Sequence, residues 1–370
     1  MKYIDAFRNP AAAAVLRGRV AALEAGLSSR GKRVTIMEVC GTHTMAIARY
    51  GIRDLLGPAV DLVSGPGCPV CVTPAGYIDA AIAIAGRGAI IATFGDLIQV
   101  PGSSSTLAAC RSGGGWVEVC YSPMDAVDLA AKHPRKEVVF LAIGFETTIA
   151  AVVSIVQMAM VRNLRNVSLL TAFKLVPPAL KALMADPEMH ISAFLCPAHV
   201  SAIIGTEPYR PFAEQHGVPC VIAGFEPLDI LFALEAILRQ VLEGRAAVEN
   251  QYSRVVRAEG NRKAQAVMRE YLTPLDAVWR GLGCVPESGL GLRLPFADFD
   301  AEKRHGVKVL PGEDQPGCLC GDVVKGKVKP PQCPMFGRRC TPDRPYGPCM
   351  VSSEGTCAAW HKYSALRTAG

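Results

Sequence analysis

The stretch VVFLAIGFETTIAAVVSIVQMAMV, residues 138–161, decides the fold, because it is almost long enough to span a bilayer. Glu146 lies inside it, beside Gly144, and a charged side chain at that depth would be costly in lipid. We therefore interpret the stretch as a buried strand (VVFLAIG), a turn (FETT) and an apolar helix capped by Thr147 or Thr148. This interpretation predicts soluble core and no membrane span.

The same alternation of a short β-branched run with a longer helical stretch continues on both sides, from residue 34 to about residue 244. Strands that alternate with helices indicate parallel sheets built from βαβ units. The predicted fold class is therefore α/β, with two similar parallel-sheet lobes and a cysteine-rich, mainly helical or irregular third domain. The predicted strands are residues 34–39, 60–65, 89–95, 138–144, 167–173, 191–195 and 218–224.

A short internal similarity suggests that the lobes are related. The pair Cys68-Pro69 is echoed by Cys196-Pro197, and the turn Gly-Phe-Glu occurs at residues 144–146 and again at residues 224–226. After residue 244 the chain changes to a charged helical stretch (246–280) and a Gly/Pro/Cys-rich tail (281–357), which could not build a hydrophobic core unaided. We predict lobes at residues 31–135 and 136–244, and a third domain formed by residues 1–30 and 245–370, on which the helix Ala11–Leu27 packs.

Composition narrows the classes of function. The chain has 370 residues, half of them hydrophobic, and a net charge of +6, with its basic residues scattered rather than gathered in a tract. This pattern does not favour nucleic-acid binding. The N-terminus lacks the charged start and apolar core of a secretory signal, so a cytoplasmic location is expected. In that compartment the 14 cysteines are metal ligands, redox thiols or buried apolar residues rather than structural disulfides.

Six cysteines gather in the tail within a Gly/Pro framework, which can bend sharply enough for four sulfurs to converge on a metal centre. The only close pair is Cys-x-Cys, whereas zinc sites usually show two C-x2–4-C knuckles, so the spacing favours an iron–sulfur cluster over zinc. Structural disulfides are the least favoured alternative. A cubane with an adjacent dithiol pair would use all six. They are Cys318, Cys320, Cys333, Cys340, Cys349 and Cys357.

Two further thiol motifs follow predicted strands. Cys40 lies between a strand and a helix, where helix N–H groups favour the thiolate, and His43 is three residues on. Taken alone, Cys40 is more simply a small buried residue, with Thr42 as the helix cap. Cys68 and Cys71 form C-x-x-C before the next helix, a spacing that favours redox chemistry over inert packing. Both motifs should open into one crevice at the carboxyl ends of neighbouring strands.

Other polar and thiol side chains carry weaker signals. Glu146, His199 and Glu226 are expected to reach the same face, although two turn-capping carboxylates and a core histidine are about equally good interpretations. The remaining cysteines without a motif are assigned to the core: Cys110, Cys120, Cys220 and Cys284.

Together these segments resemble the HypD family of hydrogenase maturation factors over essentially the whole chain. The matching motifs are CGTHT (40–44), GPGCPVC (65–71), GFETT (144–148), CPAHV (196–200) and CTPDRPYGPCMVSSEGTC (340–357). The resemblance implies two α/β lobes and a third domain with a 4Fe–4S cluster. It also implies a monomer that, with the small partner HypC, holds the iron on which the Fe(CN)2CO unit of nickel–iron hydrogenase is assembled. HypE supplies the cyanide, derived from carbamoyl phosphate through HypF.

The resemblance also implies roles for individual residues. The cluster ligands would be Cys318, Cys333, Cys340 and Cys357, and Cys320 with Cys349 would form the redox pair beside them. Cys40 would ligate the nascent iron together with the N-terminal cysteine of HypC, near His43 and the thiol pair Cys68/Cys71. We hypothesise an electron relay from the cluster through both thiol pairs, in an assembly scaffold rather than a turnover enzyme. The alternatives are an iron–sulfur-dependent disulfide reductase and a zinc-stabilised binding module, which would leave CGTHT and C-x-x-C without a role.

Overall fold

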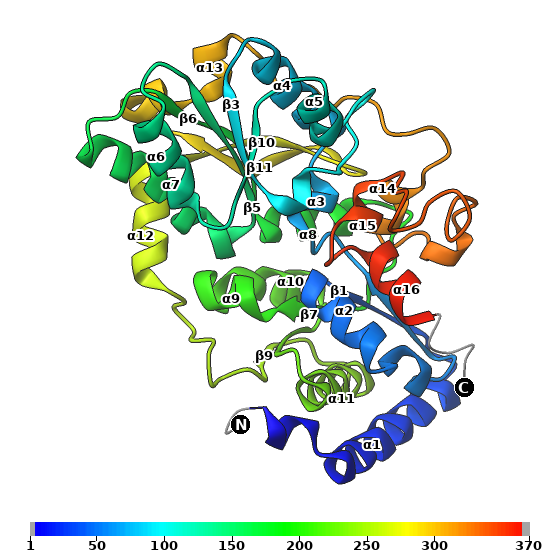
Figure 1. Cartoon of the computed structure of the whole chain (residues 1–370). Coiled ribbons are helices and arrows are strands. Elements are labelled where there is room, and N and C mark those ends of the chain that lie inside the picture. The colour runs from blue at the N-terminus through cyan, green and yellow to red at the C-terminus, as the bar shows by residue number, and fades with distance from the viewer. Residues whose placement is uncertain (1–3, 365–370) are drawn as a thin grey trace.

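Two β-sheets covered by helices form the frame of the protein, as the computed structural model, which describes residues 4–364, shows in Figure 1. The first sheet has the order β2-β1-β7-β8-β9, and all its strands are parallel. The α/β class is confirmed, with a cysteine-rich region at the C-terminal end. The strands of the first sheet are β1 (Val34–Glu38), β2 (Val60–Ser64), β7 (Ala193–Pro197), β8 (Cys220–Ala223) and β9 (Val248–Asn250).

The second sheet has the order β10-β11-β6-β5-β3-β4. Its last four strands are parallel, and the hairpin β10-β11 adds antiparallel strands at the β6 edge. Below, the first lobe and the second lobe mean each sheet with its covering helices. The strands of the second sheet are β3 (Ile90–Phe94), β4 (Val117–Cys120), β5 (Val138–Gly144), β6 (Val167–Lys174), β10 (Leu272–Trp279) and β11 (Gly283–Leu292).

The stretch that decides the fold forms β5 and α7 (Glu146–Val161). Every residue of β5 is buried, as its continuous apolar run requires of a central parallel strand. The predicted threonine cap is wrong, because Phe145 is the extended N-cap residue and α7 already begins at Glu146. Thr148 instead donates to the Phe145 carbonyl at 3.4 Å. No helix within residues 4–364 combines the length and apolar character that crossing a membrane requires.

All seven predicted strands are confirmed, but the prediction for residues 246–280 is wrong. Only α12 (Arg262–Tyr271) is helical there, and the chain continues directly into the β10-β11 hairpin. Pro274 and the glycines of β11 disguise the strands, because both residue types are unusual in strand interiors. Most of the early β10 side chains also face solvent, which removes the apolar alternation.

The two predicted lobes, residues 31–135 and 136–244, do not correspond to the two sheets. Each of these segments contributes strands to both sheets. The chain builds β1 and β2, crosses to the second sheet for β3 to β6, returns for β7 to β9, and crosses again for the hairpin. Local periodicity identifies a parallel strand but does not encode its neighbour, since the connection between parallel strands is long.

Helices cover both sheets. In the first lobe these are α1 (Pro10–Ser29), α2 (Gly41–Arg49), α9 (Ala198–Ile204), α10 (Arg210–His216) and α11 (Pro227–Glu243). In the second lobe they are α4 (Ala75–Gly86), α5 (Leu107–Ser112), α6 (Pro123–Lys132), α7, α8 (Val176–Ala185), α12 and α13 (Ala301–His305). Short 3-10 helices lie at Asp5–Arg8, Ile52–Leu55, Gly95–Leu97, Glu207–Tyr209, Leu294–Phe299 and Pro330–Gln332.

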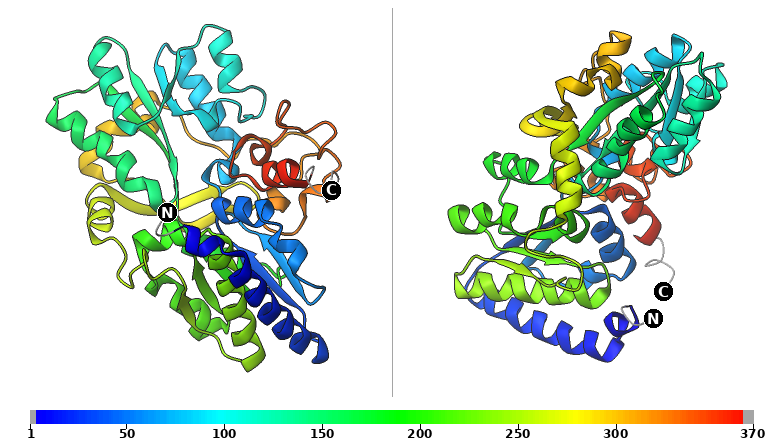
Figure 2. Two further views of the ribbon diagram at one scale, coloured as in Figure 1. Left: turned by 60° about the horizontal axis from the view of Figure 1, so that its bottom comes forward. Right: turned by 90° about the vertical axis from the view of Figure 1, so that its left-hand side faces the viewer.

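The N-terminal helix α1 does not pack on a third unit as predicted. It runs along α11 on the outside of the first lobe (Figure 2), where Val20 and Leu27 join the cluster that contains Leu234. An ion pair of 2.5 Å between Arg19 and Glu235 borders this contact. The apolar face of α1 thus completes the core of the first lobe.

The cysteine-rich tail lies against the helices that start at the thiol motifs. Helices α14 and α15 contact α3, which contains the C-x-x-C motif, and α16 packs on α2, which follows Cys40. Sequence-distant cysteines therefore meet at the ends of β1 and β2. The helices involved are α3 (Pro69–Val72), α14 (Cys320–Val324), α15 (Pro348–Val351) and α16 (Thr356–Ser364).

The packing of α1 can be tested with two residues of the same helix. Leu27 is fully buried and Val15 is 63% exposed. We expect Leu27→Ala to lower the free energy of unfolding by about 3 kcal/mol, because the cavity forms in a close-packed core. Val15→Ala should change it little, and urea unfolding followed by circular dichroism measures both. Equal effects of the two substitutions would contradict the packing described here.

Candidate thiol and metal site

Cys40 occupies the turn between β1 and α2 as the extended N-cap residue of the helix. Its thiol is buried, and the backbone N–H groups of His43 and Thr42 lie near it at the start of α2. Burial raises the pKa of Cys40 to about 12, and these N–H groups only partly oppose that effect. The predicted preference for thiolate is therefore outweighed by desolvation, so a bound metal ion would be needed to displace the proton.

The buried carboxylate of Glu38, which sequence reasoning missed, binds the backbone of Cys40. One oxygen of Glu38 accepts the Cys40 backbone N–H at 3.2 Å, and the other accepts the Thr44 hydroxyl at 2.5 Å. Arg53 lies 3.9 Å from this carboxylate. Burial raises the pKa of Glu38 to about 7. The available signal was a charged residue inside a strand whose other positions are mostly apolar.

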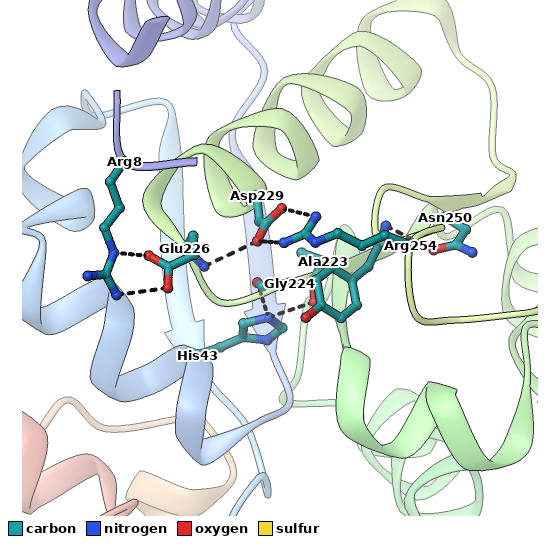
Figure 3. Close-up of polar contacts among 9 residues, drawn as sticks. Arg8, His43, Ala223, Gly224, Glu226, Asp229, Asn250 and Arg254 are labelled. Carbon is teal, nitrogen blue, oxygen red and sulfur yellow. Dashed lines mark hydrogen bonds and ion pairs between the residues drawn. The ribbon is translucent and has the colours of Figure 1, made fainter. Parts of the chain in front are cut away.

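His43 is held as a neutral ring with a defined tautomer (Figure 3). Its Nε2 atom lies 2.9 Å from the Gly224 carbonyl oxygen and 3.1 Å from that of Ala223, so Nε2 carries the proton. Burial lowers the pKa of His43 to about 4. Among the described residues the buried Nδ1 atom has no hydrogen-bond partner, so its lone pair is available to a ligand.

His199 and Glu354 complete the surroundings of Cys40. The rings of His199 and His43 both contact Phe225, with centroid distances of 4.2 and 4.9 Å. Glu354, which sequence reasoning also missed, accepts the hydroxyl of Thr42 at 2.7 Å. Burial raises the pKa of Cys40 and lowers the pKa of His199. The charge of Glu354 raises the pKa of both residues, so this carboxylate lies near Cys40 and near His199.

The two glutamates expected on this face have other partners. Glu226 caps α11 and binds Arg8, with 2.9 Å between Nη2 and Oε1 (Figure 3). Glu146 belongs to the second lobe, where it accepts the Val176 N–H at 2.9 Å and its Oε2 atom is buried without a partner among the described residues. Of the three predicted residues, His199 is the one that shares neighbours with Cys40.

The C-x-x-C motif lies directly beside the Cys40 turn. The Cys68 sulfur accepts the Cys71 N–H at 3.3 Å, and its thiol donates to the Ser352 hydroxyl of the tail at 3.3 Å. Gly67 packs on the backbone of Cys40, and a β-carbon there would overlap it. Since β1 and β2 are parallel neighbours, the expected meeting of the two motifs at one sheet edge is confirmed.

All six tail cysteines line one cavity. Sulfur–sulfur contacts link Cys318 to Cys320, Cys320 to Cys349, and Cys349 to Cys357. Cys349 also contacts Cys71, so the run of thiols extends from the tail to the C-x-x-C motif.

Two contacts at this cavity suit thiolate ligands of a metal centre. The Tyr346 N–H donates to the Cys340 sulfur at 3.4 Å, and a β-carbon on Gly347 would lie 2.8 Å from the Cys318 sulfur. Within residues 4–364 no group of three His, Cys, Asp or Glu side chains converges on a single ion. Thiolates that each bind a different iron of a cubane need not converge in that way. The residues present therefore fit a cluster better than a mononuclear zinc site.

The cysteines without a motif divide into two groups. Cys120 and Cys220 are buried as expected, and Cys220 contacts Cys196 on the neighbouring strand. Cys110 is half-buried and packs against the core, whereas the core assignment is wrong for Cys284, which is exposed on β11.

Fold and site define a two-lobed α/β protein whose cysteine-rich C-terminal segment completes a thiol site at the ends of β1 and β2. Residues 15–364 match the HypD family model, described as "Hydrogenase formation hypA family". The chain belongs to the HypD family of hydrogenase maturation factors.

Several similar proteins match over nearly their whole length. The hydrogenase expression/formation protein HupD of Azotobacter chroococcum mcd 1 is 47% identical, covering 100% of this chain and 98% of that protein. The hydrogenase maturation factor HypD of Azotobacter vinelandii is 46% identical with the same coverage. HypD of Escherichia coli (strain K12) is 41% identical over 98% of both chains.

The buried Glu146 predicts a specific pH dependence of stability. Burial raises the pKa of Glu146 from 4.5 to about 7, so its contribution is fully present below pH 4.5 and is lost as pH rises through 7. Relative to Glu146→Gln, the wild-type protein should lose up to about 3 kcal/mol of unfolding free energy between pH 4.5 and pH 8. Urea unfolding at several pH values measures this difference. The exposed control Glu259→Gln should follow the wild-type curve, and a parallel curve for Glu146→Gln would contradict the assignment.

Proposed function

We propose that this protein is the scaffold on which, together with HypC, iron is bound and the Fe(CN)2CO unit of nickel–iron hydrogenase is assembled. One observation carries the proposal: a continuous run of thiols leads from the six-cysteine cavity through Cys349 to Cys71 in α3, and the turn before this helix packs against Cys40 at Gly67. The proposed iron site at Cys40 and the thiols that would supply electrons thus lie at the same edge of the first sheet.

The cargo iron would be bound by Cys40 and the N-terminal cysteine of HypC. Iron that carries cyanide and CO is well served by soft thiolate donors. Because burial keeps the Cys40 thiol protonated, iron binding releases a proton, and Glu38 holds the Cys40 backbone in place meanwhile. The lone pair of His43 Nδ1 is available to a hydrogen-bond donor at the site. HypE would deliver cyanide to this bound iron.

The resident 4Fe–4S cluster would be held by Cys318, Cys333, Cys340 and Cys357. When bound, it would supply electrons to the neighbouring pair Cys320 and Cys349. The cavity lined by all six cysteines supports this assignment, as does the N–H donor at Cys340.

The contacts of Cys349 support thiol–disulfide exchange between the two pairs. The Cys349 thiolate attacks a Cys68–Cys71 disulfide at Cys71, which forms a Cys349–Cys71 bond and releases the Cys68 thiolate. Cys320 then attacks Cys349, which forms the Cys320–Cys349 disulfide and releases Cys71. Two electrons pass from the tail pair to the C-x-x-C pair, and no other reductant is consumed in the exchange.

The same run of thiols favours a second candidate, an iron–sulfur-dependent disulfide reductase. A reductase should reduce a generic disulfide with turnover when supplied with electrons, whereas a scaffold should not. A zinc-stabilised binding module would instead give a colourless, zinc-loaded protein after anaerobic purification.

The experiment that tests the scaffold is infrared spectroscopy of the protein co-expressed with HypC and purified without air, with iron quantified on the same sample. Bands in the cyanide and CO stretching region, together with about one iron beyond the four of a cubane, are expected. Four irons without such bands, in cells proven competent for cyanide supply, would overturn the scaffold and leave the reductase.

Cys40→Ala should abolish the cyanide and CO bands and leave the cluster iron in place. The reason is that Cys40 belongs to β1–α2 and does not line the cysteine cavity. Cys284→Ala, on the exposed face of β11, is the matched control and should retain full loading. Retained bands in Cys40→Ala would refute its assignment as a ligand.

Cys320→Ser should stop hydrogenase maturation while the visible spectrum of the cluster stays intact, because Cys349 then lacks its exchange partner. Hydrogenase activity in a complemented strain and iron content of the purified variant are the two measurements. Cys110→Ser, a half-buried cysteine with no assigned role, should mature hydrogenase normally. Full maturation by Cys320→Ser would exclude the exchange described above.

A further inference from the structure

Arg280, directly after β10, is a buried cation that the proposed assembly chemistry does not use. Its side chain is 3% exposed. The backbone N–H of Arg280 donates to the Val72 carbonyl at 2.8 Å, and Nε donates to the Thr73 carbonyl at 3.1 Å. These two acceptors immediately follow Cys71, so Arg280 fastens the β10-β11 hairpin to the end of the C-x-x-C helix.

The same side chain reaches the tail. Nη1 of Arg280 forms an ion pair with Asp314, four residues before Cys318. The next residue, Gly281, packs so closely on Gly321 that a β-carbon would overlap the Gly321 backbone. Arg280 therefore lies where the hairpin, the C-x-x-C loop and the Cys-x-Cys segment meet.

The guanidinium acts on both thiols of that segment. The hydrogen bond with Cys320 is the largest influence on Cys318 and raises its pKa, whereas the Arg280 charge lowers it. For Cys320 the hydrogen bond with Cys318 lowers the pKa, contacts with Cys349 and burial raise it well above normal, and the Arg280 charge again lowers it. Both sulfurs thus lie within the field of the same cation.

A purely structural role explains only part of this arrangement. Tying the loops together needs Nε and Nη1, but Nη2 is buried and has no hydrogen-bond partner among the described residues. Asp314 already offsets the charge of the guanidinium, but leaving the buried Nη2 donor unpaired is still costly unless an acceptor compensates for it. Anionic sulfur beside Cys318 would supply that compensation.

We propose that Arg280 is a positioning residue that holds a fixed positive charge beside Cys318 and Cys320 and thereby raises the reduction potential of the cluster bound at Cys318. The inference rests on the proposed function, since it requires that cluster. One-electron reduction adds one negative charge to the cluster, and a nearby cation stabilises the reduced state more than the oxidised state. Arginine suits this task because its guanidinium stays protonated even when buried.

The test is a potentiometric titration of the purified full-length protein with dithionite, followed by electron paramagnetic resonance. Arg280→Met, which removes the charge but keeps an apolar chain, should lower the equilibrium constant for reduction about tenfold, which corresponds to about 59 mV for one electron. Arg280→Lys should recover most of this loss because it restores the charge. Arg245→Met removes an arginine of an exposed ion pair in the first lobe and should leave the potential unchanged.

Asp314→Asn gives a second test that leaves Arg280 in place. It removes the negative partner of the guanidinium, so it should raise the reduction potential of the cluster. This variant tests the role of Arg280 if Arg280→Met loses its iron. If Arg280→Met keeps its iron, an unchanged potential in that variant would overturn the role of Arg280. If it loses its iron, an unchanged potential in Asp314→Asn would do so. A wild-type protein without a cluster would instead overturn the proposed cofactor, and iron content with the wild-type spectrum separates these outcomes.

Discussion

Close backbone contact between the cysteine-rich tail and the two lobes is the constraint on which the site depends. The tail has no core of its own, and it docks where glycines let main chains approach. A β-carbon on Gly41 would lie 2.5 Å from Cβ of Glu354, and one on Gly76 or Gly281 would overlap the backbone of Leu310 or Gly321. These contacts bring the tail cysteines against the C-x-x-C helix, where their sulfurs meet.

Burial then determines the chemistry of the thiols that this docking brings together. Burial raises the pKa of Cys40 to about 12, so the metal ion that we propose there would have to displace a proton. The neighbouring charged or titratable groups are correspondingly anchored: Glu38 binds the Cys40 backbone and His43 binds two carbonyl oxygens. A site of this kind is preorganised, since its polar side chains are already fixed by hydrogen bonds within the protein.

Sequence patterns predicted the elements much better than their arrangement. Seven strands followed from β-branched runs, and C-x-x-C and Cys40 were correctly expected at one sheet edge because they follow consecutive strands. The β10-β11 hairpin escaped because proline, glycines and an exposed face mask its alternation. The roles of Glu38, Glu354 and Arg280 depend on contacts with residues far away or on burial, and a pattern of neighbouring residues contains neither.

The site joins residues from the two ends of the chain. Cys40, Cys68 and Cys71 belong to the first quarter of the sequence, but Ser352, Glu354 and the tail sulfurs that contact their loops come from its end. The chain crosses between the sheets three times before the tail returns to β1 and β2. The sulfur partners of these early thiols therefore come from the end of the chain, and they make the local C-x-x-C pair part of a longer run of thiols. Cys349 is the residue on which this continuity depends, because it contacts Cys71 on one side and Cys320 and Cys357 on the other.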